Sequence, residues 1–281
     1  MGAFLGHALP GAVFYLTGFW SLVNVLRIVV TGAPFLHRFW YPIDVRLTKK
    51  PVEPIIKIFV CIIGVLIEMG HSARWHIHDQ AGNFINMNDL QHSTMYIAFI
   101  IASFVDILSE KSSKLHGLDA FCYFVCFTGE AFLFYFHLHG REMVDVQIHL
   151  CLVVASAMCG FIAVVARWKS SYPIISITYS LFVMLHGTWF LQAGFLMYPP
   201  FHEDTPAVNL MDPGAMMYVT NLFLAHLLVL MVLLLLLYFV FRLITPSVKQ
   251  QKHYVKHQKS ELGSPMYKTV PSSVHFYVDS D

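Results

Sequence analysis

The sequence predicts an all-α protein: a polytopic bundle of seven transmembrane helices followed by a disordered cytoplasmic tail. Hydrophobic residues make up 57% of the 281 positions and charged residues only 12%, whereas soluble domains carry roughly 25% charged residues. The mean hydropathy is +0.60. This composition predicts the lipid bilayer as the main partner, and it contains no basic domain of the kind that binds nucleic acid.

Seven segments are apolar and long enough to cross a bilayer, which takes about 20 residues of helix. Because the membrane interior has no water to satisfy the backbone, each segment is expected to be helical. The predicted spans lie near residues 10–30, 54–71, 91–108, 117–138, 145–166, 174–197 and 216–243. Together they predict a seven-span membrane domain over residues 1–245.

Lys and Arg are distributed unevenly between the two sides that seven spans define. Only Arg74 and Arg141 fall on the side of the N-terminus, and all others fall on the opposite side or in the tail. The positive-inside rule then places the N-terminus outside the cell or in a lumen, and the C-terminus in the cytoplasm. The membrane is expected to be the plasma membrane or an endomembrane. Residues 246–281 are polar and lack helical periodicity, which predicts a disordered cytoplasmic tail.

His and acidic residues recur inside the predicted spans, where each charged side chain costs roughly 2.5–3.5 kcal/mol. Nearly all of them fall in the half of the membrane nearer the N-terminus. Glu130 and His137 share one helix face, and Asp145 and His149 share another. Imidazoles and carboxylates that converge from different helices suit a divalent metal. The candidate ligands are Glu68, His92, Glu130, His137, His139, His149, His186 and His226.

A divalent metal, with zinc as the first choice, is therefore the predicted cofactor, and Glu130 and Asp145 are the candidate catalytic residues. A metal-bound water would supply the nucleophile of a hydrolase that acts on a lipid substrate. A proton- or metal-linked transporter is one alternative. It is disfavoured because the fifth span after His149 and the stretch from Leu230 to Phe241 contain no ionisable group. A non-catalytic membrane scaffold is the other alternative.

Several short motifs resemble the transmembrane protein 45 family of multipass membrane proteins. They are Gly6-His7-Ala8-Leu9-Pro10-Gly11, His92-Ser93-Thr94-Met95-Tyr96, Glu130-Ala131-Phe132, His137-Leu138-His139-Gly140-Arg141-Glu142-Met143 and Gly187-Thr188-Trp189-Phe190-Leu191-Gln192. The resemblance covers about residues 1–245 and implies a multispan fold without an established activity. Its pattern includes His7, His92, Glu130, His137, His139, Asp145, His149 and His226. The sequence contains no phosphate-binding loop, dinucleotide fingerprint or His-Glu-x-x-His motif.

Overall fold

The structure is a computed structural model that describes residues 4–42, 51–70, 75–112, 117–200 and 206–245. These residues form seven helices and no strand, apart from one isolated bridge between His78 and Phe84. The helices are α1 (Phe4–Thr31), α2 (Val52–Gly70), α3 (Met87–Lys111), α4 (Leu118–Phe136), α5 (Met143–Trp168), α6 (Pro173–Met197) and α7 (Pro213–Ile244). The predicted all-α, seven-helix fold class is confirmed. The predicted tail, residues 246–281, lies outside the described residues.

Six of the seven helices are long and apolar enough to cross a membrane. The exception is α2, a 19-residue helix that carries Glu53, Lys57 and Glu68 in an otherwise apolar sequence. Glu53 and Glu68 are both buried, so these charges face the interior of the bundle. On α7, by contrast, Val229 and Leu236 are 66% and 59% exposed. Apolar side chains of this size on an outer surface indicate contact with lipid, so the chain is an integral multipass membrane protein.

Local signals explain where α7 begins. Asp212 is the N-cap residue, and its carboxylate accepts hydrogen bonds from the backbone N–H groups of Gly214 (2.9 Å) and Ala215 (3.2 Å). Pro213 follows in the first helical position, where a missing N–H costs nothing. The helix then runs for 32 residues, about 48 Å at 1.5 Å per residue. This is longer than the hydrocarbon core of a bilayer, roughly 30 Å.

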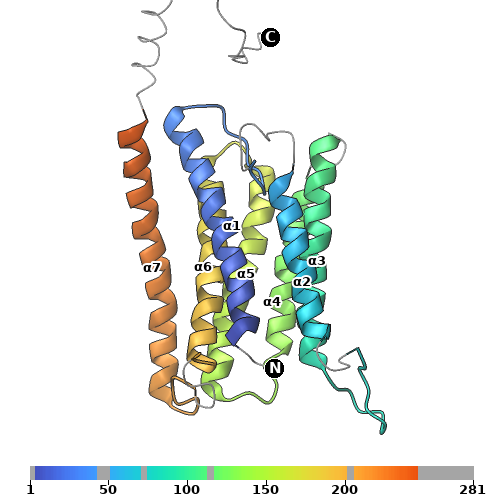
Figure 1. Cartoon of the computed structure of the whole chain (residues 1–281). Coiled ribbons are helices and arrows are strands. Elements are labelled where there is room, and N and C mark those ends of the chain that lie inside the picture. The colour runs from blue at the N-terminus through green and yellow to red at the C-terminus, as the bar shows by residue number, and fades with distance from the viewer. Residues whose placement is uncertain (1–3, 43–50, 71–74, 113–116, 201–205, 246–281) are drawn as a thin grey trace, which may run out of the picture.

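The helices pack against one another in a definite order. Close packing joins α2 to α3, α3 to α4, α4 to α5, α5 to α6 and α6 to α1, while α7 packs outside against α5, α6 and α1. The pair α1 and α2 is not among the closely packed helices, although the two lie at the ends of this series (Figure 1). Side chains of both helices line the interior of the bundle between them.

Glycines allow the closest helix contact, between α1 and α6. A Cβ atom added to Gly11 would lie 2.9 Å from the carbonyl oxygen of Gly187, and one added to Gly18 would lie 2.9 Å from the backbone nitrogen of Met184. Small residues let helix backbones approach in membranes, where van der Waals packing replaces the hydrophobic effect between helices. This contact fixes α1 against α6 and leaves its other face toward the interior.

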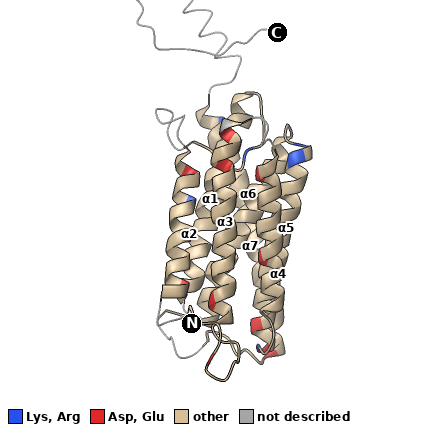
Figure 2. Cartoon of the chain, turned by 90° about the vertical axis from the view of Figure 1, so that its right-hand side faces the viewer, with Lys and Arg blue, Asp and Glu red and all other residues tan. Residues whose placement is uncertain are grey.

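The two ends of the bundle differ in charge. We call the end at which α1, α3, α5 and α7 begin the N-terminal end, and the other the C-terminal end. In Figure 2, most of the Lys and Arg residues lie toward the C-terminal end, whereas acidic residues occur at both ends. At the C-terminal end, the segment after α1 folds back over the bundle. The indole nitrogen of Trp20 donates to the carbonyl oxygen of Tyr41 (3.2 Å), and Nδ1 of His37 lies 2.5 Å from Oγ of Ser176.

Candidate functional site

One cavity connects the polar groups inside the bundle. It has a volume of about 100 Å³, room for several water molecules, each of which needs roughly 10–15 Å³. Six helices, α1 to α6, line it, and most of its wall is apolar and aromatic. Its ionisable lining residues come from both ends and from the middle of the bundle: His7, Glu53, Lys57, Glu68, His92, Glu130 and His149.

A chain of imidazoles and carboxylates lies at the N-terminal end. Nδ1 of His92 is 3.4 Å from Oε2 of Glu68, so an ion pair forms here when His92 is protonated. The His92 ring centroid lies 5.5 Å from that of His137, which in turn lies 5.7 Å from that of His149. Nδ1 of His149 is 2.8 Å from Oδ1 of Asp145. The structure thus brings together five of the residues that the sequence singled out.

Arg141 occupies the centre of this group, which the sequence did not predict. Its Nη1 donates to both carboxylate oxygens of Asp145, at 2.8 and 3.2 Å, and its Nε donates to the carbonyl oxygen of His137 at 2.8 Å. Its Nη2 also contacts Nε2 of His137. Burial, with a further contribution from the Arg141 guanidinium, lowers the pKa of His137 from 6.5 to about 3. His137 is therefore a neutral imidazole at physiological pH.

The predicted shared metal site is not supported by the described residues. Within them, no group of three or more His, Cys, Asp or Glu side chains is arranged to hold a metal ion. The physical reason lies partly in Arg141, because its positive charge occupies the carboxylate of Asp145 and one ring nitrogen of His137. The other ring nitrogen of His137 lies 2.8 Å from Oε1 of Gln91. We therefore derive no chemical step through a metal.

The remaining predicted ligands lie apart from this group. His139 is exposed, and its ring stacks on Phe136. His226 lies on α7, with its ring edge-on to Trp189 at a centroid distance of 5.7 Å. The candidate residues therefore do not all line the cavity, and their assignment as metal ligands stays a prediction. The proposed roles of Glu130 and Asp145 in catalysis stay predictions.

Glu130 lies on α4, six residues before the last residue of the helix, Phe136. Its Oε2 accepts a hydrogen bond from Oγ of Ser156 on α5 (2.8 Å) and lies 3.1 Å from Nε2 of His186 on α6. Glu130 is 3% exposed and His186 is fully buried. Among the described residues, no Lys or Arg forms an ion pair with this carboxylate. It is a buried acid held by one hydroxyl and one imidazole.

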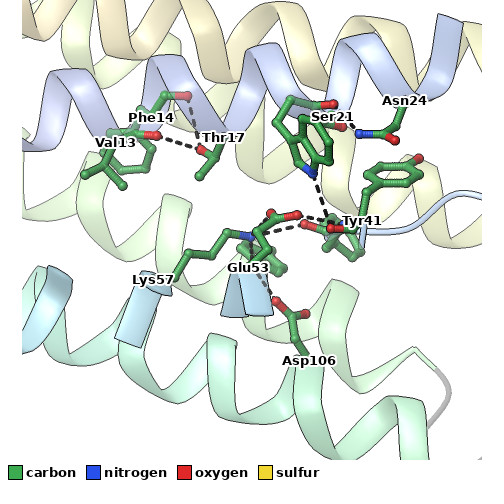
Figure 3. Close-up of polar contacts among 12 residues, drawn as sticks. Val13, Phe14, Thr17, Ser21, Asn24, Tyr41, Glu53, Lys57 and Asp106 are labelled. Carbon is green, nitrogen blue, oxygen red and sulfur yellow. Dashed lines mark hydrogen bonds and ion pairs between the residues drawn. The ribbon is translucent and has the colours of Figure 1, made fainter. Parts of the chain in front are cut away.

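A second charged group lies at the C-terminal end (Figure 3). Nζ of Lys57 is 2.7 Å from Oε1 of Glu53, whose Oε2 accepts a hydrogen bond from the backbone N–H of Tyr41 (2.7 Å). Nζ also lies 3.2 Å from the hydroxyl of Tyr123, which donates to Oδ2 of Asp106 at 2.7 Å. Glu53 and Asp106 are 7% and 2% exposed.

This group corrects one expectation from the sequence. Transport was disfavoured there because the half of the membrane away from the N-terminus seemed apolar. That inference considered α5 and α7 but not the start of α2, where Glu53 and Lys57 form an i, i+4 pair that faces inward. The spacing of opposite charges four residues apart in an apolar stretch was the signal that could have revealed it.

Comparison with known proteins gives a family match and two distant relatives. A family model described as "Family of unknown function (DUF716)" matches residues 116–239. "Transmembrane epididymal protein 1" from Homo sapiens is 21% identical over 153 residues, which cover 52% of this chain and 54% of the relative. "Transmembrane epididymal protein 1A" from Mus musculus is 20% identical over 246 residues, 82% of this chain and 77% of the relative.

These matches correct the family resemblance drawn from short motifs. The chain aligns with about half the length of the human relative, and both relatives are named as transmembrane proteins, in agreement with the fold. The family predicted from the motifs, transmembrane protein 45, is not the one that the comparisons support. The chain is instead similar, over residues 116–239, to the family of unknown function DUF716, and more distantly to the transmembrane epididymal proteins.

Proposed function

We propose that this chain is a proton-linked membrane transporter. The observation that carries the proposal is the cavity, which is lined by ionisable side chains at the N-terminal end, at mid-depth and at the C-terminal end. Buried ionisable groups are costly in a membrane, and where they persist they often mark proton or ion pathways. A site confined to one face of the membrane would not require charged residues at three depths.

The charge balance at each depth supports proton exchange. Glu130 has a hydroxyl and an imidazole for partners but no Lys or Arg. At the C-terminal end, Glu53 and Asp106 supply two carboxylates against the single ammonium of Lys57. Oδ1 of Asp106 is buried without a hydrogen-bond partner among the described residues.

Direction across the membrane follows from the positive-inside rule. Most Lys and Arg residues lie toward the C-terminal end of the bundle, which supports a cytoplasmic location for that end and an outer or lumenal location for the N-terminal end. In this orientation the His92–His137–His149 group faces the outer or lumenal side. The Glu53–Lys57–Asp106 group faces the cytoplasm.

Proton flux into liposomes tests the proposal. The purified full chain is reconstituted with a pH-sensitive dye inside, and a potassium gradient with valinomycin supplies the driving potential. We expect the interior of liposomes that contain the chain to acidify faster than that of empty liposomes. This difference should be lost in Glu130→Gln, which keeps the size and hydrogen-bonding capacity of the side chain but cannot exchange a proton. Glu110→Gln is the matched control, because Glu110 lies on the bundle surface with a side chain 51% exposed. Equal flux through wild type and Glu130→Gln would refute the proposal.

Zinc binding and hydrolysis of a lipid stay separate proposals, which the described geometry does not favour. Elemental analysis of the purified chain tests the first directly, and near one zinc per chain would revive it. For a structural scaffold, His149→Ala should lower thermal stability by the same amount with or without a chelator. A scaffold should also show no proton flux above that of empty liposomes.

A further inference from the structure

Only one of the two carboxylate oxygens of Glu130 contacts a hydrogen-bond partner among the described residues. Both of its hydrogen-bond partners, Ser156 and His186, contact the same oxygen, Oε2. Oε1 has no partner among the described residues, and Glu130 is one of the residues that line the cavity. A buried carboxylate beside a cavity, with one oxygen that lacks a partner, can accept a hydrogen bond or bind a cation there.

Aromatic rings surround the cavity at this depth. Phe14 from α1 lies with its ring centroid 5.3 Å from that of Phe99 on α3 and 6.0 Å from that of Phe190 on α6. Phe99 lies 5.2 Å from Phe127 on α4. All four rings line the cavity together with Glu130. They come from four different helices and pack on one another, so together they form an aromatic wall of the cavity.

We propose that this site binds an organic ammonium ion with apolar substituents, held by Oε1 of Glu130 and by the faces of the surrounding rings. The proposal rests on the proposed function and names the molecule whose movement is linked to protons. A carboxylate and aromatic faces both attract a cation, and an aromatic enclosure is the usual protein solution for substituted ammonium groups. The rings accommodate the apolar substituents, which a purely polar site would reject.

Two simpler occupants fit the site less well. A metal ion such as Ca²⁺ or Mg²⁺ requires six or more oxygen ligands, and the cavity offers one carboxylate at this depth among aromatic rings. A neutral apolar molecule would fill the space but would leave Oε1 of Glu130 without a hydrogen-bond or ion-pair partner. An ammonium ion uses both features of the site.

Binding of benzyltrimethylammonium to the full chain in nanodiscs tests the proposal independently of transport. This ion carries a permanent charge, and neopentylbenzene is its uncharged carbon isostere. By isothermal titration calorimetry, with empty nanodiscs subtracted, we expect saturable binding of the cation and none of the isostere. Glu130→Gln should weaken binding by about tenfold or more, and Phe14→Leu by a smaller factor, because the other three rings remain to contact the cation. Glu110→Gln should bind like wild type.

The comparison of the cation with its uncharged isostere in wild type does not depend on any variant. Equal binding of the isostere, or wild-type affinity in a folded Glu130→Gln, would overturn the proposal. Proton flux without ammonium binding would reject this inference and leave the proposed function intact. Ammonium binding without proton flux would support this inference and refute the proposed function.

Discussion

Replacing Lys57 with Met should strongly destabilise the bundle, because it removes the only cation from a buried group that holds two carboxylates. Nζ of Lys57 lies 2.7 Å from Oε1 of Glu53, 3.2 Å from the Tyr123 hydroxyl and 3.3 Å from the Phe39 carbonyl oxygen. The side chains of Lys57 and Glu53 are 13% and 9% exposed, so bulk water has little access to these contacts. Breaking a buried ion pair by removing one partner costs about 3–5 kcal/mol.

The assay is thermal unfolding of the detergent-purified chain, followed by loss of the monodisperse peak in size-exclusion chromatography. At roughly 2–4 °C per kcal/mol, Lys57→Met should lower the midpoint by about 10 °C. The double variant Lys57→Met with Glu53→Gln should recover much of this loss, because the uncompensated carboxylate is gone, so the two substitutions should not be additive. A midpoint within about 2 °C of wild type for Lys57→Met would show that the charge of Lys57 is not needed, and would refute the reasoning.

Three further predictions concern stability. The pKa of His137 falls from 6.5 in the unfolded chain to about 3 in the fold, so between these pH values the unfolded state binds one more proton than the folded state. The free energy of unfolding should therefore decline as the pH falls from 6.5 toward 3. In His137→Gln, the unfolding midpoint should fall less steeply over the same pH range. Gly187→Ala should cost about 1–3 kcal/mol, since its Cβ would meet the backbone of Tyr15 and the carbonyl oxygen of Gly11, whereas Gly129→Ala, with no atom within 4 Å, should unfold like wild type. Asp212→Ala should cost about 1 kcal/mol through loss of the α7 N-cap, seen as faster hydrogen exchange at Gly214 and Ala215; unchanged exchange would contradict this.

The sequence was sufficient for the fold because membrane helices follow from local composition. A run of apolar residues such as Leu222–Phe241 must form a helix in lipid whatever its neighbours are, and α7 covers all of it. The order of packing could not be read in this way. Nothing in the sequences of α1 and α2 indicates that they fail to pack against each other while α1 packs on α6 through Gly11 and Gly187.

The candidate site was only partly predictable, for a related reason. Helical spacing correctly grouped Asp145 with His149, which contact each other at 2.8 Å. It also grouped Glu130 with His137, but the partner of Glu130 is His186, 56 residues away on α6. Spacing along one helix gives the direction of a side chain relative to its own helix. It does not give the rotation of one helix against another, which decides the contacts between them.

Arg141 accounts for the difference between the predicted metal site and the observed ion pairs, and this account can be tested. Its guanidinium holds Asp145 and contacts Nε2 of His137, so a metal ion would have to displace one positive charge with another. With Arg141→Gln, the side chains of His137, Asp145 and His149 would form a set of two imidazoles and one carboxylate, which suits zinc. Zinc should then raise the unfolding temperature of Arg141→Gln, but not of wild type, and a chelator or an added His149→Ala should abolish the gain. If zinc stabilised wild type equally, Arg141 would not be what prevents binding, and the metal site expected from the sequence would regain support.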